Sequence, residues 1–118
     1  MSVRSPEALA QAQLDAYNLR DVDAFCDCYS ADVQVYGRDG ALALDGAAAF
    51  RASYAEAFAA WDEFGAAVDR RVVDGDTVID HERWWRARPG ERREGRVRVT
   101  YTVRDGRIAV VRFTEDEG

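Results

Sequence analysis

Residues 96–113 read RVRVTYTVRDGRIAVVRF, and this stretch decides the fold class. Up to Val103, valine or tyrosine alternates strictly with arginine or threonine, which is the period of two expected of a strand with one buried face. Asp105-Gly106 is a typical hairpin turn, and apolar residues resume at Ile108. The stretch therefore predicts two antiparallel strands, at residues 96–104 and 107–113, with an apolar face that packs against other elements.

Two more turn signals extend this pattern toward the N-terminus. Asp74-Gly75 is predicted to join strands at residues 68–73 and 77–88, and Pro89-Gly90 to open a loop that ends at Gly95. The region from residue 64 onward is therefore expected to form three successive hairpins of one antiparallel sheet.

The N-terminal half instead carries helix signals. Ser5-Pro6-Glu7 combines a capping residue, a first-turn proline and an acid, and the helix it begins is expected to break at residues 18–20. Asp21 is predicted to cap a short second helix that reaches Tyr29. A third helix is predicted from Asp45-Gly46 to about Trp61.

Between the second and third helices, Val33 and Val35 alternate with polar neighbours, and Leu42 and Leu44 follow the Asp39-Gly40 turn. Both patterns predict short strands. The fold class is therefore α+β, with three N-terminal helices packed on one face of a curved antiparallel sheet.

Length and composition support one domain, residues 1–118, without metal or cofactor. A chain of 118 residues can bury a core unaided. All 16 basic residues are arginine, which excludes lysine-based Schiff-base chemistry. The single histidine makes a zinc or iron site improbable, and Cys26 and Cys28 point to different sides of a helix, which suits packing better than a disulfide or a metal.

No apolar run has the roughly 20 residues of a membrane span, and residues 1–6 lack the apolar stretch of a secretory signal. We therefore expect a soluble cytoplasmic protein that does not bind membranes.

The run at residues 78–85 is ambiguous because both of its faces mix apolar and charged side chains. Opposite charges across neighbouring strands are favourable, so Asp80 and Glu82 are expected to share the outer face with the arginines of residues 96–98. This register places His81, Arg83 and Trp85 on the inner face, toward the helices.

An inner face of this kind predicts a ligand pocket. His81 is the candidate base, because histidine titrates near neutral pH, with Arg83 or Tyr101 as an electrophilic helper. The remaining candidate ligand-binding residues are Gln13, Tyr17, Tyr54, Trp61, Trp85 and Val99. The alternative is that His81 is simply a hydrogen-bonded histidine of the core.

The sequence also resembles a known family. The segments QAQLDAYNLRDVDAF (11–25), YSADV (29–33), LDGAAAF (44–50) and VDGDTVIDHE (73–82) are similar to the nuclear transport factor 2-like superfamily. The closest branch is the SnoaL-like one, which includes polyketide cyclases and steroid delta-isomerase-like proteins. The resemblance covers nearly the whole chain and implies a cone, often dimeric through the outer sheet face, with a pocket inside.

In the isomerase members, the resemblance implies cofactor-free proton transfer by a carboxylate, assisted by a tyrosine and a protonated acid. The corresponding positions here hold Gly37, Gln13 and Val99, so this constellation is absent.

Three functions remain to be weighed. The first is a small-molecule-binding domain, acting by acid/base chemistry as an isomerase, cyclase or hydratase on a hydrophobic or anionic organic ligand. The second is a non-catalytic ligand-binding or dimerisation domain. The third, nucleic-acid binding through the seven arginines of residues 83–98, is disfavoured by the net charge of −6.

Overall fold

The computed structural model describes residues 4–116. The helices are α1 (Pro6–Leu19), α2 (Val22–Asp27) and α3 (Ala47–Ala60). The strands are β1 (Tyr29–Tyr36), β2 (Leu42–Asp45), β3 (Glu63–Asp74), β4 (Thr77–Arg88), β5 (Glu91–Arg104) and β6 (Arg107–Thr114).

The predicted helix starts are confirmed by their caps. The side chain of Ser5 accepts a hydrogen bond from the backbone N–H of Ala8, and the side chain of Asp21 accepts one from Ala24. Arg20 ends α1 in the left-handed conformation, with φ of 56°. The predicted end of the second helix is wrong, because α2 stops at Asp27 and Tyr29 already belongs to β1.

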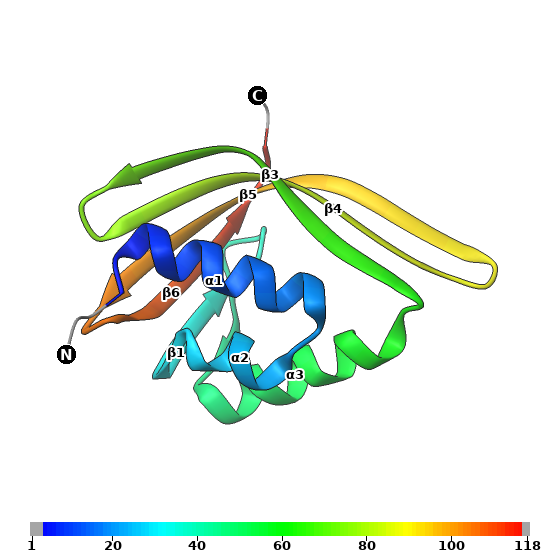
Figure 1. The fold of residues 1–118 in the computed structure, drawn as a ribbon, viewed down its shortest axis with the longest axis horizontal. Coiled ribbons are helices and arrows are strands. Elements are labelled where there is room, and N and C mark those ends of the chain that lie inside the picture. Colours follow the sequence, from blue (N-terminus) through cyan, green and yellow to red (C-terminus); the bar gives the residue numbers. More distant parts are fainter. Residues whose placement is uncertain (1–3, 117–118) are drawn as a thin grey trace.

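The six strands form one sheet in the order β2-β1-β6-β5-β4-β3. All neighbours are antiparallel except β1 and β6, which run parallel. The helices lie together on the concave face of the curved sheet (Figure 1). The α+β fold class, with three helices on one face of a curved sheet, is therefore confirmed.

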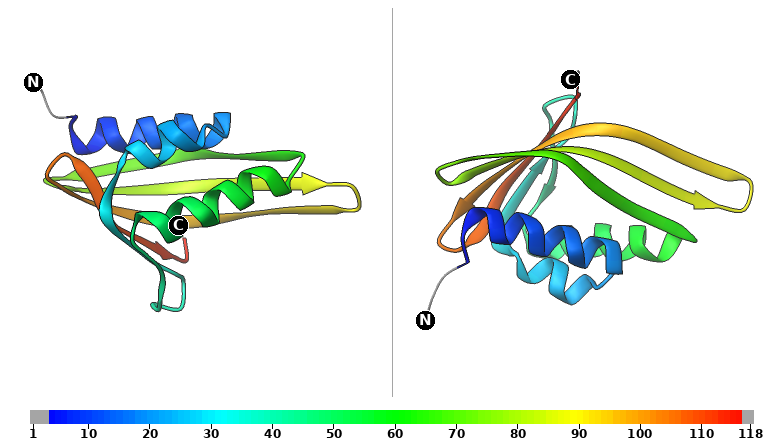
Figure 2. Two further views of the ribbon diagram at one scale, coloured as in Figure 1. Left: turned by 90° about the horizontal axis from the view of Figure 1, so that it is seen from below. Right: turned by 45° about the horizontal axis from the view of Figure 1, so that its top comes forward.

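The hairpin of β4 and β5 is longer than expected. Arg88 pairs with Glu91 across a two-residue turn at Pro89-Gly90, so the loop predicted up to Gly95 is wrong. Residues 91–95 continue the strand, and the hairpin projects beyond the helices (Figure 2).

This turn also corrects the predicted faces of β4. Because Arg88 is paired with Glu91, Glu82 is opposite Val97 and Asp80 is opposite Val99. Asp80 and Glu82 therefore lie on the inner face, and His81 and Arg83 on the outer face. A one-residue slip moves every side chain of a strand to the opposite face, and the cross-strand charge argument selected the wrong register.

On the outer face, this register places two arginines side by side, and an acidic residue offsets their repulsion. Arg83 stands directly opposite Arg96, and a bulge in β3 between Val68 and Arg70 lets Asp69 reach both. The Asp69 carboxylate accepts from Arg83 Nε at 2.8 Å and lies 3.9 Å from Arg96. A carboxylate from a third strand thus stabilises two adjacent arginines.

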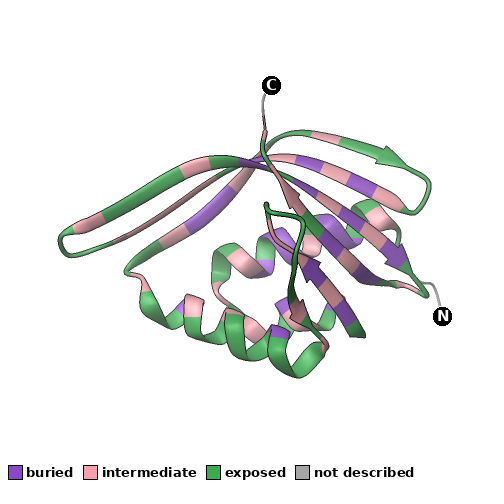
Figure 3. Cartoon of the chain, turned by 180° about the vertical axis from the view of Figure 1, so that it is seen from behind, coloured by how far each residue is buried: buried purple, intermediate pink, exposed green. Residues whose placement is uncertain are grey.

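Buried residues line the inner face of the sheet and the facing sides of the helices (Figure 3). Phe25, Phe50, Val78 and Ile108 are among the most buried side chains. Phe25 stacks on Phe50 with ring centroids 5.5 Å apart. The core therefore occupies the space between the helices and the sheet, where the apolar alternation of β5 predicted it.

Other expectations concern single residues. Cys26 is half-buried and Cys28 buried, and both are free thiols. Near the C-terminus, the Asp116 carboxylate lies 3.0 Å from His81 Nδ1. Within residues 4–116, no helix is long and apolar enough to cross a membrane.

Candidate active site

A cavity of about 750 Å³ lies between the inner face of the sheet and the helices. Its wall is mainly apolar and aromatic. The apolar and aromatic lining comprises Leu14, Tyr17, Phe25, Tyr29, Val35, Ala43, Leu44, Tyr54, Ala57, Phe64, Ala66, Trp84, Val97, Tyr101, Val111 and Phe113. A cavity of this size and composition is typical of sites for small organic molecules.

Four polar side chains of this wall form one chain of hydrogen bonds. The Tyr29 hydroxyl donates to Gln13 Oε1 at 2.9 Å, and Gln13 Nε2 donates to the Tyr101 hydroxyl at 3.0 Å. Tyr101 in turn donates to Glu82 Oε2 at 3.2 Å. This chain of hydrogen bonds links the start of β1 to α1, α1 to β5, and β5 to β4. It ends at the carboxyl of Glu82.

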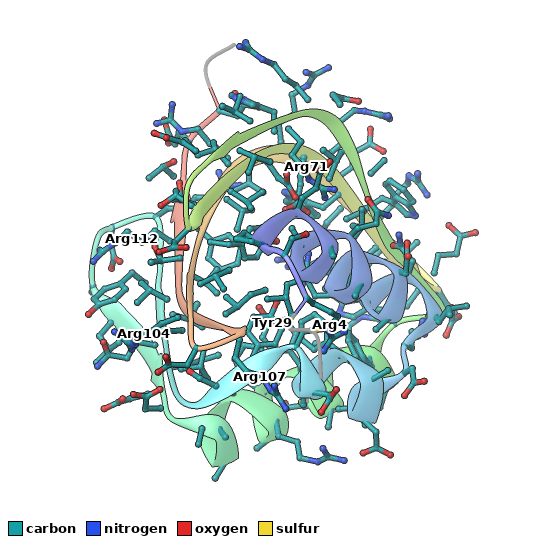
Figure 4. The ribbon with its side chains drawn as sticks, turned by 60° about the vertical axis from the view of Figure 1, so that its left-hand side comes forward. Arg4, Tyr29, Arg71, Arg104, Arg107 and Arg112 are labelled. Atoms are coloured by element: carbon teal, nitrogen blue, oxygen red, sulfur yellow. The ribbon has the colours of Figure 1, made fainter. Side chains whose placement is uncertain are left out.

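Gln13 organises this chain. It lies on the side of α1 that faces the sheet and is 4% exposed. Its second amide hydrogen bonds the Ala10 carbonyl at 3.0 Å, which holds the side chain in one orientation. Tyr29 lies inside the arch that the sheet makes around α1 (Figure 4). The hydroxyls of Tyr29 and Tyr101 are thereby fixed relative to Glu82.

Glu82 is the only acidic residue of the described cavity wall, and its pKa is raised to about 7. Burial is the main cause, and the negative charge of Asp80 adds to it. The hydrogen bond from Tyr101 and the charge of Arg71 act in the opposite direction. A carboxyl with such a pKa can accept or donate a proton near neutral pH.

Asp80 lies behind the cavity rather than on its wall. It is fully buried, and its two oxygens accept hydrogen bonds from Arg71 at 2.7 and 3.0 Å. Arg71 also donates to Gln11 at 2.9 Å, between the sheet and α1 (Figure 4). Within this pair, the carboxylate of Asp80 raises the pKa of Glu82 and the guanidinium of Arg71 acts in the opposite direction.

Burial also raises the pKa of the cavity tyrosines. It raises the pKa of Tyr17 and Tyr54, with the nearby Arg86 charge as a smaller opposing effect. The pKa of Tyr101 is raised by burial and by the charge of Glu82. These hydroxyls therefore stay protonated at neutral pH and can act as hydrogen-bond donors.

The structure brings together part of the site expected from the sequence. Gln13, Tyr17, Tyr54 and Tyr101 line the cavity. Among the lining residues found in the described chain, Trp61, Trp85 and Val99 do not appear. Val99 is buried opposite Asp80, and Trp85 covers Gly65 on the outer face.

The predicted placement of His81 and Arg83 in the cavity is wrong. His81 contacts Asp116, and Arg83 contacts Asp69, on the outer face of the sheet. The physical reason is the strand register set by the tight turn at Pro89-Gly90.

Sequence reasoning missed Glu82, Tyr29, Trp84 and Arg86, all of which line the cavity. A signal for Glu82 was present. If Pro89-Gly90 is taken as a two-residue hairpin loop, counting back from it pairs Glu82 with Val97 on the apolar face of β5. No local sequence pattern predicts the hydrogen bond between Tyr29 and Gln13.

The chain is similar to known proteins in both sequence and fold. The sequence model of the SnoaL-like domain matches residues 10–111. No curated protein matches the chain at a significant level. Among solved structures, an uncharacterized cystatin fold protein from Novosphingobium aromaticivorans has a TM-score of 0.87 at 25% identity, covering 95% of this chain and 99% of that one.

Two further structures share the fold at lower identity. A proposed polyketide cyclase from Sinorhizobium meliloti has a TM-score of 0.75 at 24% identity, covering 90% of this chain and 93% of its own. An LEH-like epoxide hydrolase from M. tuberculosis has a TM-score of 0.80 at 19% identity, covering 92% and 80%.

Proposed function

Because this chain belongs to the SnoaL-like domain family, we propose that its cavity binds a hydrophobic organic molecule and that Glu82 exchanges a proton with it. The reaction type is cofactor-independent acid/base chemistry, as in an isomerase, cyclase or hydratase. One observation carries the proposal: a single carboxyl with a pKa of about 7 lies buried on an apolar cavity wall.

The surrounding residues support this role. The ionised carboxylate of Glu82 accepts a proton from the ligand, and Tyr101 stabilises that carboxylate through its hydrogen bond. Gln13 holds the Tyr101 hydroxyl in place from the other side. Glu82 is buried, and a carboxyl shielded from bulk water has stronger electrostatic interactions with its neighbours. Glu82 of β4 thus takes the place of the base that is absent at Gly37, which follows β1.

A model base-catalysed reaction tests the proposal. The ring of 5-nitrobenzisoxazole opens when a base removes its C3 proton and the N–O bond breaks, which releases a coloured cyanophenolate. We expect the wild type to accelerate this reaction with a rate that rises with pH around an apparent pKa of about 7. Glu82→Gln should lower the rate about 100-fold or more.

Glu63→Gln is the matched control, since Glu63 is an exposed glutamate of β3. It should keep the wild-type rate. A wild-type rate no faster than that of free carboxylate buffer would contradict the proposal, as would an unchanged rate in Glu82→Gln.

Non-catalytic binding is the second candidate. It is favoured by one observation: within residues 4–116, every fully buried polar side-chain atom already has a hydrogen-bond partner in the protein. Saturable ligand binding without any ring opening in the wild type would support this candidate over the first.

We also propose that two copies associate through the outer face of the sheet. Asp80 and Glu82 were expected on this face but lie inside, and the face carries Ile79 and Trp85 in their place, with Thr100 opposite Ile79. Half-buried Ile79 and Trp85 offer apolar area beside charged pairs, which suits a self-complementary interface. Sedimentation of a monomer at micromolar concentration would contradict the dimer.

A further inference from the structure

Arg86 differs in its contacts from the neighbouring arginines of the hairpin formed by β4 and β5. Its neighbours pair with glutamates, as in Arg88 with Glu91 at 2.9 Å and Arg93 with Glu91 at 2.7 Å. Arg86 lines the cavity, and its guanidinium has no carboxylate partner among the residues that the structure describes. It is therefore an uncompensated positive charge on the wall of a ligand-sized cavity.

Two tryptophans hold this guanidinium in place. Arg86 Cζ lies 4.8 Å from the ring centroid of Trp84 and 5.5 Å from that of Trp61. Contact with aromatic faces fixes the guanidinium plane and leaves the N–H groups at its edge free to donate. No fully buried side-chain nitrogen within residues 4–116 lacks a partner, so the unpaired Arg86 nitrogens remain accessible.

The other charges of the cavity reinforce that of Arg86. Three of the described lining residues bear on the charge of the cavity. Arg38 and Arg86 are permanently positive, and Glu82 titrates near neutral pH. Arg38 is exposed and donates to the Arg96 carbonyl at 2.9 Å, which joins the β1–β2 loop to β5. With Glu82 protonated, the cavity is positive although the whole chain has a net charge of −6. A positive cavity in an acidic protein concentrates anions at that point.

We propose that Arg86 is an anion subsite and that the ligand is a flat hydrophobic molecule carrying a carboxylate or phenolate oxygen anion. The planar guanidinium fork matches such a group, and the adjoining Tyr17, Phe64 and Trp84 provide surfaces for the rings. This inference rests on the proposed function, since it specifies the ligand of the same cavity.

The spacing of the two charged groups constrains the ligand further. Glu82 and Arg86 are four residues apart on β4, which places their Cα atoms about 13 Å from each other. Trp84 lies between the two residues on the same face of β4, so the anionic group and the atom that exchanges a proton belong to separate parts of the ligand. A body of at least two fused rings fits this arrangement.

A pair of probes of equal shape tests the subsite. Naphthalene-2-carboxylate and naphthalene-2-carboxamide differ mainly in charge, and their binding can be measured by calorimetry at low salt and about pH 6, where Glu82 is mostly protonated. We expect the wild type to bind the carboxylate about tenfold or more tightly than the amide. Arg86→Gln should reduce this preference to less than about twofold.

Arg92→Gln is the matched control, because it removes one positive charge from the same hairpin, at an exposed residue that is paired with Glu63 and Glu94 and absent from the described cavity lining. It should keep the preference, and Arg86→Lys should keep part of it. Equal affinity of the wild type for both probes, an unchanged preference in Arg86→Gln, an equal loss in Arg92→Gln, or no saturable binding of the carboxylate would each overturn the subsite.

Glu82→Gln separates this inference from the proposed function. It should lower the rate of ring opening about 100-fold or more and leave the carboxylate preference intact. If ring opening survives Glu82→Gln while the Arg86 preference holds, the proton-transfer proposal fails and the anion subsite stands. If the preference is absent while Glu82→Gln abolishes ring opening, the subsite alone fails.

Discussion

Arg71 binds Asp80 through two hydrogen bonds of 2.7 and 3.0 Å on the inner side of the sheet, and Asp80 is completely buried. The two residues stand directly opposite each other on β3 and β4. Burying a lone carboxylate is costly, so this fork is what allows an acid to occupy the inner face. Through that placement, Arg71 also determines the electrostatic surroundings of Glu82.

Arg71→Met should therefore destabilise the fold strongly. Removing one partner of a buried ion pair leaves the other charge without compensation, which costs about 3–5 kcal/mol. Arg83→Met is the control, because its pair with Asp69 is about half-exposed, and such pairs contribute about 1 kcal/mol or less. Urea unfolding of both variants measures the difference, and equal losses would refute the distinction between the two faces.

Glu82 should make stability depend on pH in a defined direction. Its pKa is about 7 in the fold against 4.5 for the unperturbed group, so the folded state holds the proton more tightly than the unfolded state. The stability of the wild type should then fall as pH rises from about 4.5 to above 7, by up to about 3 kcal/mol.

Glu82→Gln cannot titrate at this position, so its stability should lack this decline. The difference between the two free energies of unfolding, measured by urea denaturation at a series of pH values, isolates the contribution of Glu82. Parallel curves for the two proteins would show that the carboxyl is not perturbed.

Tyr101→Phe should alter both stability and proton affinity. It removes a donor from Glu82 and an acceptor from Gln13, and leaving such buried groups unpaired costs about 1–3 kcal/mol. Because the hydrogen bond from Tyr101 lowers the pKa of Glu82, its loss should move the apparent pKa of the ring-opening reaction upward. Tyr36→Phe, which loses only a 3.3 Å bond to Gln34, should change neither property. An apparent pKa that stays the same in Tyr101→Phe would contradict this.

Two glycines offer a test of which tryptophan faces the cavity. A Cβ at Gly95 would come within 2.8 Å of the Trp84 ring, and a Cβ at Gly65 within 2.7 Å of the Trp85 ring. Either alanine must displace the tryptophan that covers it, at a cost of about 1–3 kcal/mol.

The two variants should differ in ligand binding. Gly95→Ala shifts Trp84, which contacts Arg86, and should weaken binding of naphthalene-2-carboxylate. Gly65→Ala shifts Trp85 on the outer face and should leave this affinity unchanged. Calorimetric titration measures both affinities. Weaker binding in Gly65→Ala alone would show that Trp85, and not Trp84, faces the cavity.

The sequence by itself determined the elements and the fold class. Helix caps at Ser5 and Asp21, the period of two in β5 and the turn at Asp105-Gly106 are local signals, and each appears in the structure where it was predicted. Local signals suffice here because caps, turns and alternating burial act over a few residues. The same reasoning found four of the cavity residues, including Gln13 and Tyr101.

The tertiary structure decided which face of β4 enters the cavity. A cross-strand charge pair contributes at most about 1 kcal/mol, which is too little to overrule the register set by a tight turn. The cost of placing Asp80 inside is met by Arg71 from β3, and the outer arginines are stabilised by Asp69 at a bulge. These partners come from another strand, so the pattern within β4 alone does not show that Glu82, and not His81, faces the ligand cavity. The one sequence signal for this register lies outside β4, in the turn at Pro89-Gly90.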